Sequence, residues 1–187
     1  SDVEAVEYRK RYLDLLINLP ESVASWQPAP VLENDHIGPI PRTNISIKIS
    51  SLFANTDPIA HDVSLEGLFE SLRPILEEAK ENSTFINFDM EQFEYKDLTL
   101  DLFMKCCDEI NFPAGLAMQA YLRSGDDDAK KIIEWSTRTG RQVTVRLVKG
   151  AYWDYETIHA EEMGWPVPVW SRKVDTDACF ERMAALF

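Results

Sequence analysis

Positive charge is scarce in this sequence. Its 187 residues hold 19 lysines and arginines against 32 aspartates and glutamates, which gives a formal net charge of −13. Nonspecific binding of nucleic acid needs a basic surface that displaces counterions, so the charge balance argues against that class of function. A locally basic pocket can exist in an acidic protein, and small-molecule chemistry therefore stays open.

Long apolar runs and cysteines are also few. No stretch reaches the roughly 20 apolar residues that a membrane-spanning helix needs, and no basic-then-apolar segment suggests a signal peptide. Cys106, Cys107 and Cys179 are too few and too unevenly spaced for a disulfide framework or a zinc site. We therefore predict small core residues in a reducing, cytoplasmic compartment.

The apolar pattern alternates between strand and helix along most of the chain. Residues 2–18 have helical spacing, and residues 19–42 hold five prolines with little periodicity, which predicts a helix followed by a loop. Beyond them, alternation with period two predicts strands and spacing near 3.6 predicts helices. The predicted strands are 44–50, 84–89, 115–121, 142–150 and a short fifth at 167–173; the predicted helices are 64–80, 97–111, 126–140, 154–163 and 175–187.

Regular alternation of strand and helix indicates an α/β protein with a parallel sheet. A doubly wound sheet and a (β/α)8 barrel both have this order, but no glycine-rich phosphate loop follows the first strand. Each strand has one apolar parity and one parity of small or polar residues, which suits a barrel interior. We predict an incomplete (β/α)8 TIM-type barrel of about five βα units over residues 44–187, after an N-terminal helix and proline-rich linker over residues 1–43.

Four consecutive predicted strands each direct one strongly polar side chain toward the barrel axis. If the apolar parity faces the helices, these inward residues are Lys48, Asp89, Gln119 and Arg146. Two cations, a carboxylate and an amide that converge at strand ends are typical of a site for an anionic substrate or a cofactor. A structural Arg–Asp pair inside the barrel stays open as an alternative, because a buried guanidinium needs a partner.

Simpler interpretations also exist for single residues of this set. Lys48 taken alone is typical of an exposed edge residue. Asp89 and Glu91 could form a turn or a metal pair, but no histidine at ligand spacing supports a metal, and we predict none.

At these same residues the sequence resembles a known family. The segments SIKISSL, FDME, QAY and VRLVKGAYWDYE are similar, in this order and spacing, to the proline dehydrogenase domain of bacterial bifunctional proline-utilisation proteins. In those proteins the domain is coupled to a glutamate-semialdehyde dehydrogenase. The resemblance runs from about residue 44 to the end of the chain and is looser before it.

The resemblance implies a distorted (β/α)8 barrel that holds FAD noncovalently and oxidises L-proline to Δ1-pyrroline-5-carboxylate. A hydride passes from proline C5 to flavin N5, and the electrons then go to a membrane quinone. This implies a cytoplasmic protein that contacts the inner membrane face peripherally during turnover.

The resemblance also implies roles for individual residues. Arg146 would lie beside flavin N5, Asp89 between the two cations, and Lys48 on the substrate carboxylate. Tyr152 would flank the proline ring. The other cofactor-binding residues that it implies are Met90, Gln119, Val148, Lys149, Gly150, Ala151, Trp153, Ser171, Arg172 and Lys173; Ser171 replaces the family's usual threonine and keeps the hydroxyl.

Part of the family's site has no counterpart in this sequence. The arginine pair that binds the substrate carboxylate in the family lies on a late helix, and the chain stops at Phe187, before that helix. We therefore expect a part of a longer protein that is inactive alone. Two alternatives stay open: a noncatalytic barrel fragment whose Arg–Asp–Lys set is structural, and another barrel enzyme that acts on a carboxylated or phosphorylated substrate.

Overall fold

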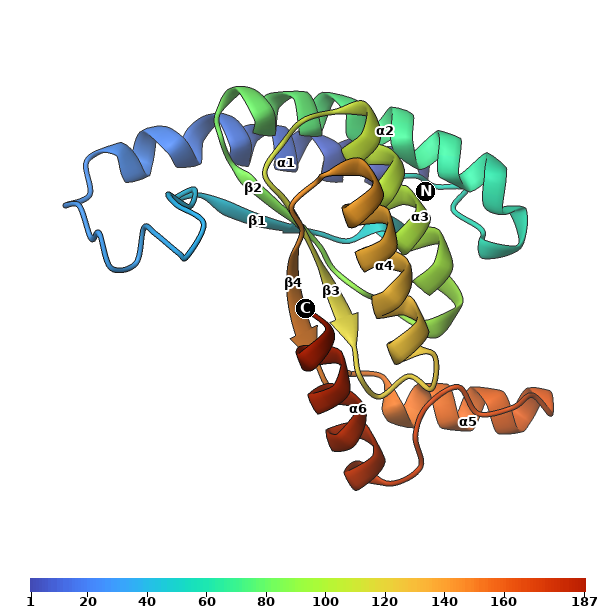
Figure 1. Cartoon of the computed structure of the whole chain (residues 1–187). Helices are drawn as coiled ribbons and strands as arrows, with labels where there is room; N and C mark the ends of the chain where they lie inside the picture. The colour runs from blue at the N-terminus through green and yellow to red at the C-terminus, as the bar shows by residue number, and fades with distance from the viewer.

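The computed structural model describes residues 1–187 and contains one parallel sheet with helices connecting its strands (Figure 1). No helix is both long enough and apolar enough to cross a membrane. The strands are β1 (Asn44–Ile47), β2 (Phe85–Phe88), β3 (Ala114–Gln119) and β4 (Thr144–Val148), and the α-helices are α1 (Asp2–Ala24), α2 (His61–Glu81), α3 (Lys96–Glu109), α4 (Gly125–Thr139), α5 (Trp153–Met163) and α6 (Lys173–Leu186).

The four strands lie in chain order, β1-β2-β3-β4, and every neighbouring pair is parallel. Parallel neighbours need a crossover of a dozen or more residues, and α2, α3 and α4 are those crossovers. Since the sheet does not close, β1 and β4 are its edges. This is the sequential βα order of a barrel wall, and it confirms the predicted fold class.

The main core lies between the sheet and the helices. Ile45, Ile47 and Ile49 are all buried, as the alternation in this segment predicts. Phe88 of β2 packs edge-on against Phe103 of α3 at 5.4 Å between ring centroids. The apolar parity of the strands thus faces the helices, and the polar parity is left for the opposite face.

The first helix is longer than predicted. The sequence predicts a helix over residues 2–18 with a loop from Leu19, but α1 continues through Pro20 to Ala24. Leu16 and Val23, seven residues apart, are both buried on one face, and this burial outweighs the backbone hydrogen bond that Pro20 cannot make. Leu16 belongs to the main core, and α1 packs mainly on α2.

The predicted fifth strand at 167–173 does not form, and this part of the prediction is wrong. Only Val169 makes an isolated bridge, antiparallel, to Leu122 in the turn after β3. The Arg123 guanidinium donates to the carbonyls of Val167 and Val169, each at 3.1 Å, and stacks over Trp170. These contacts hold the segment against that turn rather than beside β4. The sheet therefore has four strands instead of about five.

Candidate active site

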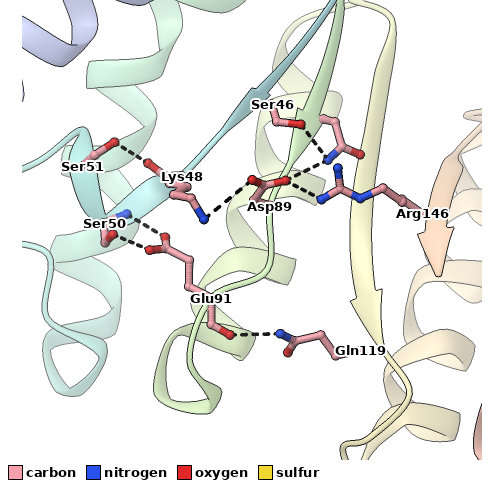
Figure 2. A network of polar contacts seen from close by, with 9 residues as sticks. Ser46, Lys48, Ser50, Ser51, Asp89, Glu91, Gln119 and Arg146 are labelled. Carbon is pink, nitrogen blue, oxygen red and sulfur yellow. Dashed lines mark hydrogen bonds and ion pairs between the residues drawn. The ribbon is translucent and has the colours of Figure 1, made fainter. Parts of the chain in front are cut away.

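The candidate site lies where the four parallel strands end. Lys48 directly follows β1, Asp89 directly follows β2, and Gln119 is the last residue of β3. Arg146 lies in β4, two residues before its end. Because the carboxyl ends of parallel strands meet at one edge, side chains distant in sequence come together there (Figure 2).

Asp89 joins two cations from the two edge strands. Arg146 Nη2 lies 2.6 Å from Asp89 Oδ1, and Lys48 Nζ lies 3.8 Å from Asp89 Oδ2. Arg146 reaches across β3 because its register partner there is Ala117, a side chain too small to block the path. The predicted Lys–Asp–Arg set therefore exists as a connected cluster of ion pairs.

The two cations of the cluster are more exposed to solvent than a structural arginine in a core ion pair would be. The Arg146 side chain is 53% exposed and the Lys48 side chain 52%, while Asp89 is 18% exposed. Arg146 makes no side-chain hydrogen bond other than the one to Asp89. The expectation of a buried guanidinium is thus wrong for this structure, because the open sheet leaves the axis side of β4 uncovered. Most donors of both cations remain available.

Two residues of the cluster are missed by the sequence analysis. Asn87 is buried, and its Nδ2 donates to Asp89 Oδ1 at 3.2 Å and to Ser46 Oγ at 3.5 Å. Asn87 therefore orients the carboxylate that holds both cations. The signal was present, since Ser46 and Asn87 each lie two residues before Lys48 and Asp89 and share their inward parity.

Gln119 and Glu91 form a separate group of contacts. Gln119 Nε2 donates to the Glu91 carbonyl at 3.3 Å, and its Oε1 is buried without a hydrogen-bond partner. The Glu91 carboxylate accepts from Ser50 and not from the partners of Asp89. No group of three or more His, Cys, Asp or Glu side chains could hold a metal ion.

The loop after β4 packs against the turn after β3. Gly150 has φ of +135°, and a Cβ there would overlap the ring of Tyr121. This aromatic ring therefore accounts for the glycine. Tyr121 is buried with its hydroxyl unpartnered, and burial raises its pKa. Trp153 donates from Nε1 to the Trp170 carbonyl at 2.8 Å, which ties the start of α5 to the segment before α6.

Three predicted cofactor-binding cations meet near the start of α6. Lys149, after β4, and Lys173, at the start of α6, both pair with Asp177. Arg172 makes a two-pronged contact with Asp175 at 2.7 and 2.8 Å. The hydrogen bonds and charges of these aspartates raise the pKa values of Lys173 and Arg172. Two chain segments predicted from the resemblance are thus brought together.

The remaining predicted residues have varied surroundings. Met90 is buried in the main core, and Val148 and Tyr152 are partly exposed. Ala151 and Ser171 are exposed. None of these five contacts the Asp89 cluster through a hydrogen bond or ion pair, and their cofactor and substrate roles stay predictions.

A cavity that sequence reasoning did not find lies apart from this cluster. It has a volume of about 490 Å³ and contains none of the predicted site residues. Its walls come from the 3₁₀ turn η3 (Phe93–Tyr95), from α5 and from residues 165–168. Within it, His159 stacks on Tyr155 and meets Trp165 edge-on. His159 therefore has an aromatic packing role, which its sequence position did not predict.

The fold and the site together define a class of protein: an α/β protein with the parallel strand order of a barrel wall and a charged cluster at the carboxyl ends of its strands. The family model described as proline dehydrogenase matches residues 1–187, and the chain belongs to that family. This confirms the resemblance carried by the strand-end segments.

Individual relatives agree with the family. The bifunctional protein PutA of Klebsiella aerogenes is 34% identical over 151 residues, which are 76% of this chain and 12% of that protein. Proline dehydrogenase 1 of Bacillus subtilis (strain 168) is 31% identical over 110 residues, 59% of this chain and 32% of that protein. The chain thus spans about a third or less of the length of these relatives.

Solved structures agree as well. Proline utilization A of Bdellovibrio bacteriovorus, inactivated by N-propargylglycine, has a TM-score of 0.95 and 40% identity, covering 98% of this chain and 20% of that one. Proline utilization A of Corynebacterium freiburgense has a TM-score of 0.79 and 30% identity, covering 98% of this chain and 18% of that one. The four-stranded wall is therefore a fold shared with these proteins.

Proposed function

We propose that this chain forms part of an FAD-dependent proline dehydrogenase that oxidises L-proline to Δ1-pyrroline-5-carboxylate. The observation that carries the proposal is the Lys48–Asp89–Arg146 cluster, with two half-exposed cations at the strand ends of a chain from this family. A zwitterionic amino acid needs a cation for its carboxylate, and an electron acceptor needs one for the charge it gains.

The residues of the cluster divide this work. Lys48 supplies a point charge to the substrate carboxylate, and its ammonium group is exposed enough to receive it. Arg146 lies two strand positions before Val148, and its donors that are not bonded to Asp89 would stabilise the negative charge that a flavin gains on reduction. Asp89 keeps the two cations in place and does not act as the base that removes the substrate's amine proton. Tyr152 flanks the proline ring.

The chemistry of the residues present suits FAD, which has two phosphate groups and a ring with hydrogen-bond donors. Lys149, Arg172 and Lys173 gather three cations near the start of α6, paired now only with Asp175 and Asp177, and phosphate groups could replace those partners. Gln119 Oε1 is a buried acceptor without a donor, beside the predicted ring site. When bound, FAD supplies the acceptor for the hydride that leaves proline C5.

The other predicted flavin contacts complete this proposal. Arg146 would reach the ring from β4, and Met90, which is buried in the main core, would border it from the segment after β2. Val148, Gly150 and Ala151 would line it largely through their backbone, and the Trp153 ring would lie beside them. Ser171 contributes its hydroxyl near the phosphate-bearing arm.

Beyond the reaction itself, we propose the wider setting of the bifunctional relatives. The electrons pass to a membrane quinone, and a glutamate-semialdehyde dehydrogenase domain is fused in the longer protein. The protein is cytoplasmic and contacts the inner membrane face during turnover. The isolated chain is expected to be inactive, because its open sheet leaves both edge strands unpaired.

Colour tests the proposal directly. The intact protein should be yellow, and anaerobic addition of L-proline should bleach the flavin absorbance. Correctly folded intact protein that is colourless and gains nothing from added FAD would contradict it. Yellow protein that L-proline does not bleach would instead favour a barrel enzyme for another anionic substrate.

A further inference from the structure

A second row of contacts crosses the strand ends beside the ionic cluster (Figure 2). Both oxygens of the Glu91 carboxylate accept from Ser50: Oε1 from the backbone N–H at 3.1 Å and Oε2 from the hydroxyl at 2.5 Å. The Glu91 carbonyl accepts from Gln119 at 3.3 Å. One buried residue thus links the turn after β1 to the end of β3.

The turn that Glu91 holds begins at Lys48. Lys48 is the N-cap of the 3₁₀ turn η1 (Ile49–Ser51), and its carbonyl accepts from Ser51 Oγ at 2.8 Å. The β1–β2 ladder ends just before, where the Asp89 amide donates to the Ile47 carbonyl at 2.9 Å. Among the four strands of this chain, β1 is hydrogen-bonded to β2 alone.

The contacts of the Lys48 ammonium group fix its position only weakly. It lies 3.8 Å from Asp89, beyond normal hydrogen-bond length, and its side chain is half exposed. A flexible four-carbon stem in such a setting depends on where its backbone is fixed. A buried carboxylate with both oxygens bonded is a stiff anchor by comparison, because leaving it unpaired would be costly.

We propose that Glu91 is a positioning residue that fixes the η1 turn and thereby holds Lys48 opposite the substrate carboxylate. The inference rests on the substrate-binding role proposed for Lys48. In this role Glu91 needs no contact of its own with the substrate or the cofactor. It acts through Ser50, two residues after Lys48, in the same segment of chain.

The test is Glu91→Ala in the intact holoenzyme. The apparent KM for L-proline should rise about fivefold while kcat changes less than about twofold, because only the ground-state hold on the carboxylate is loosened. Glu91→Gln should restore most of the parent KM. Its amide oxygen can still accept from the Ser50 amide, and its NH₂ group can donate to the Ser50 hydroxyl.

A double-mutant cycle separates positioning from general structural damage. In a Lys48→Ala background, Glu91→Ala should raise KM no further, because the group that it positions is gone. Glu94→Ala, on an exposed side chain three residues on, is the matched control and should leave KM unchanged. Additive effects of Glu91→Ala and Lys48→Ala on KM would overturn the inference. A fall in kcat as large as the rise in KM would overturn it too.

The same cycle tells two failures apart. If Lys48→Ala raises KM and Glu91→Ala does not, the positioning role of Glu91 is wrong and the role of Lys48 stands. If Lys48→Ala itself leaves KM unchanged, the substrate-binding role of Lys48 is wrong, and the inference falls with it.

Discussion

Two lysine–aspartate sets of similar composition have very different surroundings in this molecule. Between α3 and α4, Lys96 Nζ lies 2.7 Å from Asp128 Oδ1 and 2.7 Å from Asp97, with Lys96 and Asp128 both buried. Asp128 Oδ2 also accepts from the Ser124 hydroxyl at 2.7 Å. At the strand ends, Lys48 lies 3.8 Å from Asp89, and its side chain is half exposed.

The difference indicates which set is structural and which is open to a ligand. Burial alone would lower the pKa of Lys96, but the hydrogen bonds and charges of Asp128 and Asp97 raise it above the usual value. The Lys96 charge is therefore paired with carboxylates of the chain itself. The donors of Lys48 and Arg146 are largely unused, which is what a binding site requires. Composition does not separate the sets, but burial and pairing do.

The largest effect is expected in the buried set. Lys96→Met should destabilise the fold by about 3 kcal/mol, because it leaves the Asp128 carboxylate buried without a cation. The raised pKa of Lys96 means that its contribution is fully present below the usual lysine pKa, so a measurement at neutral pH captures all of it. Chemical denaturation followed by the fluorescence of Trp135, buried on α4, measures the change.

Lys130→Met on α4, the helix that carries Asp128, is the matched control. Lys130 pairs with Asp127 at 3.2 Å, and both side chains are more than half exposed. Its loss should cost about 0.5 kcal/mol or less. Equal losses in the two variants would mean that the buried pair contributes no more than a surface pair, and the comparison would fail.

The next effect concerns chemistry rather than stability. Arg146→Met in the intact protein should slow flavin reduction by L-proline more than tenfold, about 1.4 kcal/mol or more of barrier. Its stability should change little, since the guanidinium is half exposed and has one hydrogen-bond partner. Anaerobic stopped-flow absorbance gives the reduction rate. An unchanged rate would remove Arg146 from the chemistry and leave the Arg–Asp pair as a structural contact.

A smaller effect is expected from the other cation of the open set. Lys48→Ala should raise the apparent KM for L-proline by about tenfold with a lesser change in kcat, if the ammonium acts in ground-state binding. Steady-state kinetics over a range of proline concentrations separates the two constants. Lys131→Ala, which removes an ion pair with Asp101 on the helical side, should leave both constants unchanged. A fall in kcat without a change in KM would contradict the role.

The sequence predicts the strand-end set and most of the fold, but not the buried set. Period-two alternation places Lys48 and Asp89 on one face because the apolar isoleucines and phenylalanines must face the helices. The short run at 167–173 forms no strand because Arg123 takes up the backbone carbonyls of Val167 and Val169, while the Val169 side chain packs with Tyr121 and Leu122. The Lys96–Asp128 pair joins two residues that are 32 positions apart in sequence and lie on different helices, and no local pattern carries that information.

The smallest effect concerns a third kind of buried charge, one without a cation. Glu156 on α5 is buried, and its Oε1 accepts from the Phe93 amide at 2.7 Å, but no ion pair holds it. Burial raises the pKa of its carboxyl group. A raised carboxyl pKa means that the fold favours the neutral form, so stability declines as pH rises above the usual glutamate pKa.

Glu156→Gln should therefore stabilise the fold at neutral pH by about 1 kcal/mol, because the amide keeps the acceptor for Phe93 and carries no charge. The gain should vanish near about pH 4 and below, where the native carboxyl group is itself neutral. Denaturation of both proteins at the two pH values measures this difference, and Glu162→Gln, on an exposed side chain of the same helix, should show no change at either. Destabilisation at neutral pH would show that the charge strengthens the Phe93 contact by more than its burial costs, and an unpaired buried carboxylate would then behave like the satisfied pair of Lys96 and Asp128.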